Sequence, residues 1–214
     1  MNKFSKSFTF LSTLTFIGGF LDIYTFITRG GVFANTQTTN LAKLGYVIAN
    51  NQIYECIQYI LPIIACIIGG VTSTILVKKR NDDGLHKHLL LFEVLVFILV
   101  GLVRGSKYDL LVNTSVSFIT SFQLNLFRKY EDISHNTTIM TGNLRQVGEF
   151  IANYLISRNK NDRSIFIKYT SLVSMFLLGA IVSVILTNLF MEKSIWICGI
   201  LLLIIIKAEN VFIK

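Results

Sequence analysis

The chain has 214 residues, of which 52% are hydrophobic and only 15% are charged, and its formal net charge is +8 at pH 7. A soluble domain usually carries about 25% charged residues, so this composition indicates an integral membrane protein. The positive charge does not indicate nucleic-acid binding, because the basic residues lie between apolar segments and form no stripe. The three cysteines form no CxxC pair, which argues against a disulfide framework or a zinc site; they are Cys56, Cys66 and Cys198.

Six apolar segments are candidate membrane helices, because a span needs about 20 mostly apolar residues. The first contains Asp22 and the third contains Glu93. The fourth is the most polar, with Asn113, Gln123 and Asn125, and the sixth is short. The sequence therefore predicts an all-α membrane protein with six transmembrane helices. In chain order, the segments are Phe8–Thr28, Tyr59–Val77, Leu89–Val103, Leu110–Phe127, Tyr169–Phe190 and Ser194–Ile206.

Lys and Arg residues near the ends of the spans predict the orientation in the membrane. If the N-terminus is inside, five of the 20 Lys and Arg residues lie outside and the other 15 (20 − 5) lie inside. This excess predicts that both termini are cytoplasmic. The five residues expected outside are Arg29, Lys43, Arg104, Lys107 and Lys193.

Two stretches match each other at an offset of 103 residues (141 − 38), GVFANTQTTNLAKLGYVIAN from Gly31 and HNTTIMTGNLRQVGEFIAN from His135. The offset pairs Thr38 with Thr141, Asn40 with Asn143 and Gly45 with Gly148, and it places Asp22 opposite Asn125. We interpret residues 1–107 and 108–214 as two repeats of three spans within a single membrane domain. An odd number of spans inverts the second repeat, an architecture that many secondary transporters share.

In each repeat a short polar stretch leads into an amphipathic helix. Thr and Asn at such a place are typical N-cap residues, and a helix N-terminus at membrane depth attracts anionic and polar groups. Two re-entrant helices would bring their caps to one substrate or ion site. The alternative is that both helices lie at the membrane surfaces with ordinary caps. The candidate substrate-binding residues in these motifs are Thr38, Asn40, Thr141, Gly142 and Asn143.

Ionisable residues within spans are costly in lipid and often mark function. Asp22 is the better candidate, as a proton carrier or cation ligand, with Asn125 as its counterpart in the second repeat. Its alternative role is a hydrogen-bonded link between spans. Glu93, near the start of its span, either has a similar role or reaches the inner interface. The pairs Gly69/Ser73 and Gly179/Ser183 are interpreted as sites of close helix packing.

The motif Met140–Asn143 (MTGN) and the stretch Gly18–Gly45 resemble the YoaK-like family of bacterial inner-membrane proteins, a domain of unknown function. The resemblance covers nearly the whole chain, including the Gly-x-x-Asp of Gly19–Asp22 and the Gln-x-Asn of Gln123–Asn125. The family also carries Met-Thr-Gly-Asn in its first half, where this chain has Gln37–Asn40 (QTTN) and therefore lacks the Gly. The resemblance implies a multi-pass membrane protein and no established activity.

The leading hypothesis is a transporter or channel for a small solute or ion, with its site between the two repeats. One alternative is a non-catalytic scaffold or regulatory subunit. Another is a membrane enzyme acting on a lipid-like substrate, for which Asp22 and His135 are the only acid–base pair, although the topology puts them at opposite faces. We expect no cofactor, metal or nucleic acid. The expected partners are membrane lipid and the solute or ion, with a homo-oligomer as an open alternative.

Overall fold

The structure is a computed structural model that describes residues 7–79, 83–127, 129–130, 133–134 and 140–211. Nearly all of this chain is helical, and a pair of two-residue antiparallel strands is the exception. The elements are α1 (Phe8–Thr28), α2 (Gln37–Ala49), η2 (Ile53–Cys56), α3 (Ile57–Lys79), α4 (Asp83–Leu102), η3 (Ser106–Tyr108), α5 (Asp109–Leu126), β1 (Lys129–Tyr130), β2 (Ile133–Ser134), α6 (Met140–Ser157), α7 (Lys160–Phe190), η4 (Met191–Ile195) and α8 (Trp196–Val211).

Four helical stretches are long and apolar enough to cross a membrane: Phe8–Thr28, Ile53–Lys79, Gly84–Leu102 and the 49-residue stretch Lys160–Ala208. The last stretch contains α7 and most of α8. The more polar helix α5 is not among the four. The chain is therefore a helical membrane protein. Length and hydropathy identify four stretches that could span the membrane, whereas the sequence predicts six spans.

The helix bounds agree best with the sequence where the whole helix is apolar. Helix α1 has the predicted bounds. Helix α4 begins at Asp83, six residues before the predicted Leu89, and α7 begins at Lys160, nine before Tyr169. Both differences arise because the first turns of these helices are polar. A hydropathy pattern identifies only the apolar part of a helix.

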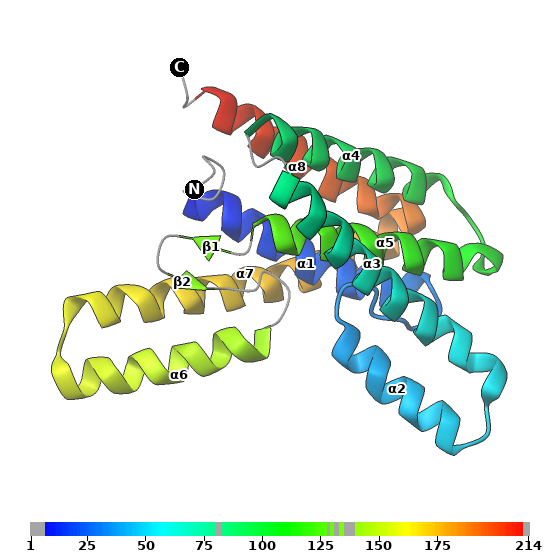
Figure 1. Ribbon diagram of the computed structural model, residues 1–214, viewed down its shortest axis with the longest axis horizontal. Helices are drawn as coiled ribbons and strands as arrows, with labels where there is room; N and C mark the ends of the chain where they lie inside the picture. The colour runs from blue at the N-terminus through cyan, green and yellow to red at the C-terminus, as the bar shows by residue number, and fades with distance from the viewer. Residues whose placement is uncertain (1–6, 80–82, 128, 131–132, 135–139, 212–214) are drawn as a thin grey trace.

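Helices from the two halves of the sequence pack against each other in matching pairs. Helix α1 contacts α7, α3 contacts α5, and α4 contacts α8. Helix α2 lies along α3, and α6 lies along α7, so two hairpins extend toward opposite ends of the molecule (Figure 1). The start of α1 and the end of α8 lie at the same end of the bundle (Figure 1).

Small residues bring the paired helices into close contact, as the sequence predicts. A Cβ atom on Gly179 would overlap the backbone carbonyl of Phe16 in α1, and one on Gly69 would overlap that of Phe118 in α5. Ser183 Oγ also donates a hydrogen bond to Phe20 O at 2.9 Å. Gly69 and Gly179 therefore each pack against the backbone of a neighbouring helix.

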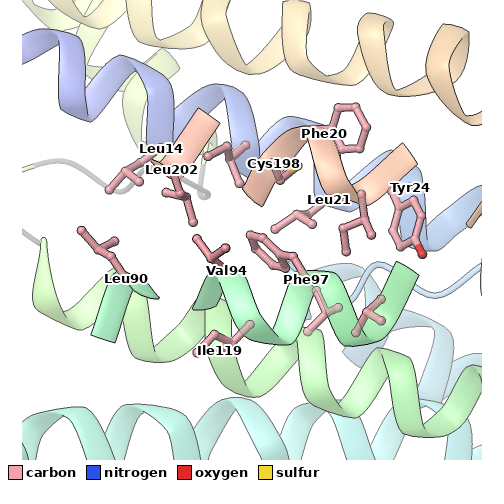
Figure 2. Packing of buried hydrophobic residues seen from close by; sticks show 14 of the residues in the cluster. Leu14, Phe20, Leu21, Tyr24, Leu90, Val94, Phe97, Ile119, Cys198 and Leu202 are labelled. Carbon is pink, nitrogen blue, oxygen red and sulfur yellow. The ribbon is translucent and has the colours of Figure 1, made fainter. Parts of the chain in front are cut away.

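The main hydrophobic core lies between α1, α4, α5 and α8 (Figure 2). The residues of this core include Leu21 from α1, Phe97 from α4 and Leu202 from α8 (Figure 2). Many apolar side chains on the outer faces of α3 and α7 are exposed. Such faces suit contact with lipid rather than water.

Candidate functional site

An irregular segment between α1 and α2 returns along α1 to the middle of that helix. Asn35 Nδ2 donates to Gly18 O at 3.1 Å, and Ala34 N–H donates to Thr25 Oγ1 at 3.1 Å. Gly18 is ten residues before the last residue of α1, so the segment returns about 15 Å at 1.5 Å per residue. Helix α2 therefore starts beside the middle of an apolar helix.

The charged residue beside this irregular segment is Asp22 of α1. It is only 5% exposed, and its Oδ2 accepts a hydrogen bond from Thr36 Oγ1 at 2.5 Å. Asp22 Oδ1 is buried without a hydrogen-bond partner among the described residues. A buried carboxylate oxygen without a partner is costly, so this position suits a proton, a cation or a hydrogen-bonding solute.

Asn40 fastens the irregular segment to α2. Its Nδ2 donates to Phe33 O at 2.8 Å and to Gln37 Oε1 at 2.9 Å, and Phe33 N–H donates to its Oδ1 at 3.3 Å. The side chain is fully buried. Asn40 therefore shapes the segment.

The predicted N-cap role of Asn40 and Thr38 is wrong. Helix α2 begins at Gln37, and its N-cap is Thr36, which makes no side-chain cap bond. The Thr36 hydroxyl is directed to Asp22 instead. Thr38 and Asn40 thus lie inside the first turn of the helix, and Thr38 is exposed.

The second motif shows the same difference from the prediction. Helix α6 begins at Met140, so Thr141, Gly142 and Asn143 belong to its first turn and do not precede it. Asn143 is buried, with Nδ2 3.7 Å from Met140 Sδ, and Met140 is the counterpart of Gln37 at the repeat offset. Thr141 is exposed like Thr38. His135, which was paired with Asp22 in the enzyme hypothesis, lies outside the described residues.

Helix α5 holds the irregular segment from its other side. Gln37 Nε2 donates to Ala34 O at 2.8 Å and to Ser117 Oγ at 3.1 Å. Ser117 Oγ in turn donates to Ala34 O at 2.5 Å. The segment thus lies between the first helix of each half of the sequence.

Asn125, the counterpart of Asp22, has a different set of contacts. Its Nδ2 donates to Gly70 O and to Ser73 Oγ, both at 3.1 Å. Asn125 therefore links α5 to α3, whereas Asp22 links α1 to the irregular segment.

Glu93 does not reach the membrane interface, so that alternative is wrong. It is the eleventh residue of α4 and only 1% exposed. Gln123 Nε2 donates to its Oε2 at 2.9 Å, while its Oε1 has no hydrogen-bond partner in the part of the chain that the structure describes. The interface prediction was wrong because hydropathy placed the start of this span at Leu89, six residues after α4 begins at Asp83.

Comparisons with known proteins identify the family of this chain. Residues 10–208 match the family described as "Protein of unknown function (DUF1275)". The chain belongs to this family. It is also 24% identical to the "UPF0700 transmembrane protein YoaK" of Bacillus subtilis (strain 168), over 88% of each chain. No solved structure matches.

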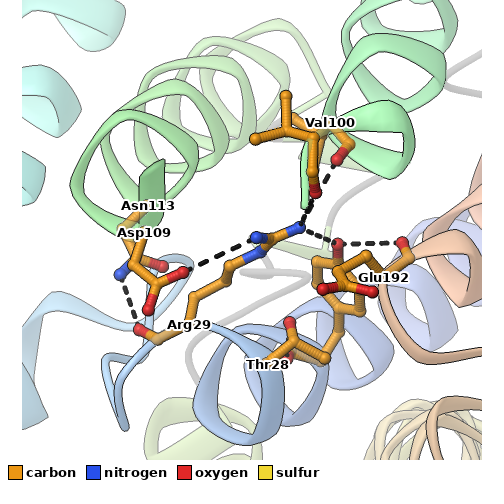
Figure 3. Close-up of polar contacts among 8 residues, drawn as sticks. Thr28, Arg29, Val100, Asp109, Asn113 and Glu192 are labelled. Carbon is orange, nitrogen blue, oxygen red and sulfur yellow. Dashed lines mark hydrogen bonds and ion pairs between the residues drawn. The ribbon is translucent and has the colours of Figure 1, made fainter. Parts of the chain in front are cut away.

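Arg29 is the residue of this DUF1275 chain that sequence reasoning missed. It was counted as an outside loop residue, but it is 1% exposed. Its Nη2 donates to Tyr24 Oη at 3.2 Å and to Val103 O at 2.8 Å, and its Nη1 lies 3.5 Å from Asp109 Oδ1 (Figure 3). Asn113 Nδ2 donates to its backbone carbonyl at 2.9 Å. Arg29 thus joins the end of α1 to α4 and α5.

Arg29 has one weak signal in the sequence. It is followed by Gly30 and Gly31, both at positive φ, which form a tight turn. Such a turn is visible in the sequence, whereas the burial depends on α4 and α5, which come far later in the chain.

Lys43 was also expected in an outside loop, and it instead fastens α2 to the end of α1. Its ammonium group donates to Gly31 O and lies 5.4 Å from the ring centre of Phe26 and 5.2 Å from that of Phe33. These cation–π contacts hold the irregular segment where α1 ends.

Within the described ranges of this family member, no group of three His, Cys, Asp or Glu residues could hold a metal ion.

Proposed function

We propose that this DUF1275 protein is a transporter or channel for a small solute or ion, with its site between two inverted three-span repeats. The site centres on Asp22, with Thr38, Asn40, Thr141, Gly142, Asn143 and Asn125 as further candidates. A non-catalytic scaffold is the competing function.

The observation that carries the proposal is the irregular segment at the middle of α1. Irregular backbone at membrane depth is tolerated only where protein or a water-filled cavity surrounds it. Discontinuous helices of this kind form the binding sites of many transporters. Here the segment bonds Asp22, whose Oδ1 has no hydrogen-bond partner among the described residues.

The packing of the helices supports the repeat. Helices α1 and α5 hold equivalent places in the repeats, as do α3 and α7. The contacts of α1 with α7 and of α3 with α5 are therefore the same contact made twice. The glycines Gly69 and Gly179 mediate it in both copies. With α5 and α8 counted as spans, the chain crosses the membrane six times.

The relative in Bacillus subtilis is named a transmembrane protein, which supports a bacterial cell membrane as the location. The distribution of Lys and Arg favours cytoplasmic termini. Arg29 is buried and Lys43 lies in α2 against the end of α1, so neither counts as a loop residue, and the remaining bias is 15 inside against three (5 − 2) outside.

Two-sided cysteine accessibility tests the proposal without knowledge of the substrate. The three native cysteines are removed, and single cysteines replace Thr38 and Thr141, which are both exposed. A membrane-impermeant thiol reagent is then applied to intact cells and to inverted vesicles. A cysteine replacing Lys107, an exposed residue of η3, is the control for labelling from one side only.

Both motif positions are expected to react from both sides, because a shared aqueous pathway alternates between them. If Thr38→Cys reacts only from outside and Thr141→Cys only from inside, the motifs are surface helices. That result overturns the pathway and favours the scaffold.

A further inference from the structure

A pocket of about 300 Å³ with both polar and apolar lining residues lies at the end of the bundle where α1 ends and α5 begins. It is separate from the Asp22 site, because Arg29 follows Asp22 by seven residues, about 10 Å along a helix axis. The lining residues that matter here are Arg29, Gly30, Glu55, Gln58, Asp109 and Asn113.

Four buried side-chain atoms of the pocket have no hydrogen-bond partner among the residues described. They are Arg29 Nε, Arg29 Nη1, Asp109 Oδ1 and Asn113 Oδ1. Arg29 Nη1 and Asp109 Oδ1 form a long ion pair at 3.5 Å. Arg29 and Asn113 are each 1% exposed. Buried polar atoms are rarely left unpaired in native proteins, so the pocket is suited to a polar occupant.

The atoms without a hydrogen bond include both donors and acceptors, and two of them, Arg29 Nε and Asn113 Oδ1, have no ion-pair partner either among the described residues. The guanidinium nitrogens of Arg29 can only donate, whereas Asp109 Oδ1 and Asn113 Oδ1 can only accept. Glu55 adds a second carboxylate at the pocket. A cation alone would leave the guanidinium unsatisfied. An anion alone would leave the acceptors unsatisfied and would meet two carboxylates.

We propose that this pocket binds a small zwitterion of the α-amino acid class. The ligand carboxylate accepts hydrogen bonds from Arg29, and its ammonium group donates to Asp109, Asn113 and Glu55. The volume of about 300 Å³ is at the lower end of the range of ligand pockets. Water also donates and accepts, and at about 30 Å³ per molecule a water-filled pocket is the outcome that the test must separate from solute binding.

Binding at this pocket does not depend on transport. The inference goes beyond the proposed function, because a receptor or scaffold could hold the same solute. A failure to bind amino acids would leave the accessibility prediction for Thr38 and Thr141 unchanged, and a failure of the accessibility prediction would leave this binding prediction unchanged.

The test measures the thermal unfolding of the purified full-length protein in detergent, with each standard amino acid added in turn. A ligand that binds only the folded state raises the unfolding temperature. Acetate and methylammonium, added separately at the same concentration, represent the two halves of the zwitterion. We expect at least one amino acid to raise the unfolding temperature saturably and neither half to do so.

Two variants locate the site. Asp109→Asn and Glu55→Gln keep the shape of the side chains but remove a charge, and each should weaken binding of the active amino acid at least tenfold. Glu55 is exposed, so its variant should fold even if Asp109→Asn is unstable. Glu149→Gln is the matched control, since Glu149 is an exposed carboxylate of α6 outside the pocket lining.

The inference is overturned if no amino acid stabilises the folded protein, which would leave a pocket filled by water. A full effect of acetate or methylammonium alone also overturns it. The same holds if both pocket variants bind the active amino acid as tightly as the Glu149→Gln control.

Discussion

Asn40 and Thr38 stand in the same turn of α2 and have opposite surroundings. Asn40 is buried and makes two hydrogen bonds with Phe33 in the segment before the helix and one with Gln37, whereas Thr38 is exposed. Substituting each residue in turn therefore tests whether Asn40 stabilises the fold while Thr38 does not.

Asn40→Ala should lower the free energy of unfolding by roughly 2 kcal/mol, because it leaves buried backbone groups of Phe33 without partners. Thr38→Ala should change it by less than about 0.5 kcal/mol, as is usual at exposed positions. Thermal unfolding followed by Trp196 fluorescence measures both. Equal effects would mean that Asn40 does not hold the irregular segment.

Arg29→Lys should destabilise the protein by roughly 3 kcal/mol. Lysine keeps the charge but cannot reach Tyr24, Val103 and Asp109 at once, since it lacks the planar fork of arginine. Arg104→Lys is the control, because Arg104 is exposed one residue after Val103. The same unfolding measurement applies, and a tolerated Arg29→Lys would contradict the linking role of Arg29.

At the residue level, the sequence could predict which side chains matter when the reason is local. Asp22 was singled out because a carboxylate in an apolar run is rare, and Asn143 and Asn40 were found through the repeat. Arg29 could not be found in this way. Its burial depends on contacts with residues at the end of α4 and in α5 that lie 71 and more positions away in the chain.

At the level of elements, close packing makes some glycines indispensable and leaves others free. A Cβ at Gly179 would overlap the backbone of α1, whereas nothing lies within 4 Å of the Cβ position of Gly148 in α6. Gly148 matches Gly45 in the repeat, and packing does not explain either residue, since both face open space.

Gly179→Ala should therefore destabilise the protein by about 3 kcal/mol, because the backbone of α1 must move to make room. Gly148→Ala should be neutral or stabilise by up to about 1 kcal/mol through helix propensity. Unfolding in detergent distinguishes them. Similar effects of the two substitutions would show that α1 and α7 do not pack this closely.

The helices themselves were predictable because apolar length is a strong signal, as the agreement at α1 shows. The start of α2 was not, because the Thr36 hydroxyl bonds Asp22 rather than the helix end. That competition between a cap and a tertiary contact is invisible in the sequence. The early starts of α4 and α7 lie in polar turns, where hydropathy gives no signal.

At the scale of the whole molecule, the account depends on where α2 and α6 begin. The irregular segment joins the middle of α1 to α5, and the α2/α3 and α6/α7 hairpins extend toward opposite ends (Figure 1). Under the proposed inverted repeat, both short helices start at membrane depth and point outward. As surface helices they would lie flat at the two interfaces.

The measurement that separates these arrangements most directly is an experimental structure of the protein in a lipid nanodisc, where the lipid belt marks the hydrocarbon layer. The account predicts that Thr36 and Met140 lie near the middle of the belt, with Ala49 and Ser157 at or beyond its edges. If α2 and α6 instead lie along the edges of the belt, with both ends of each helix at the same depth, the re-entrant site and the proposed pathway are wrong.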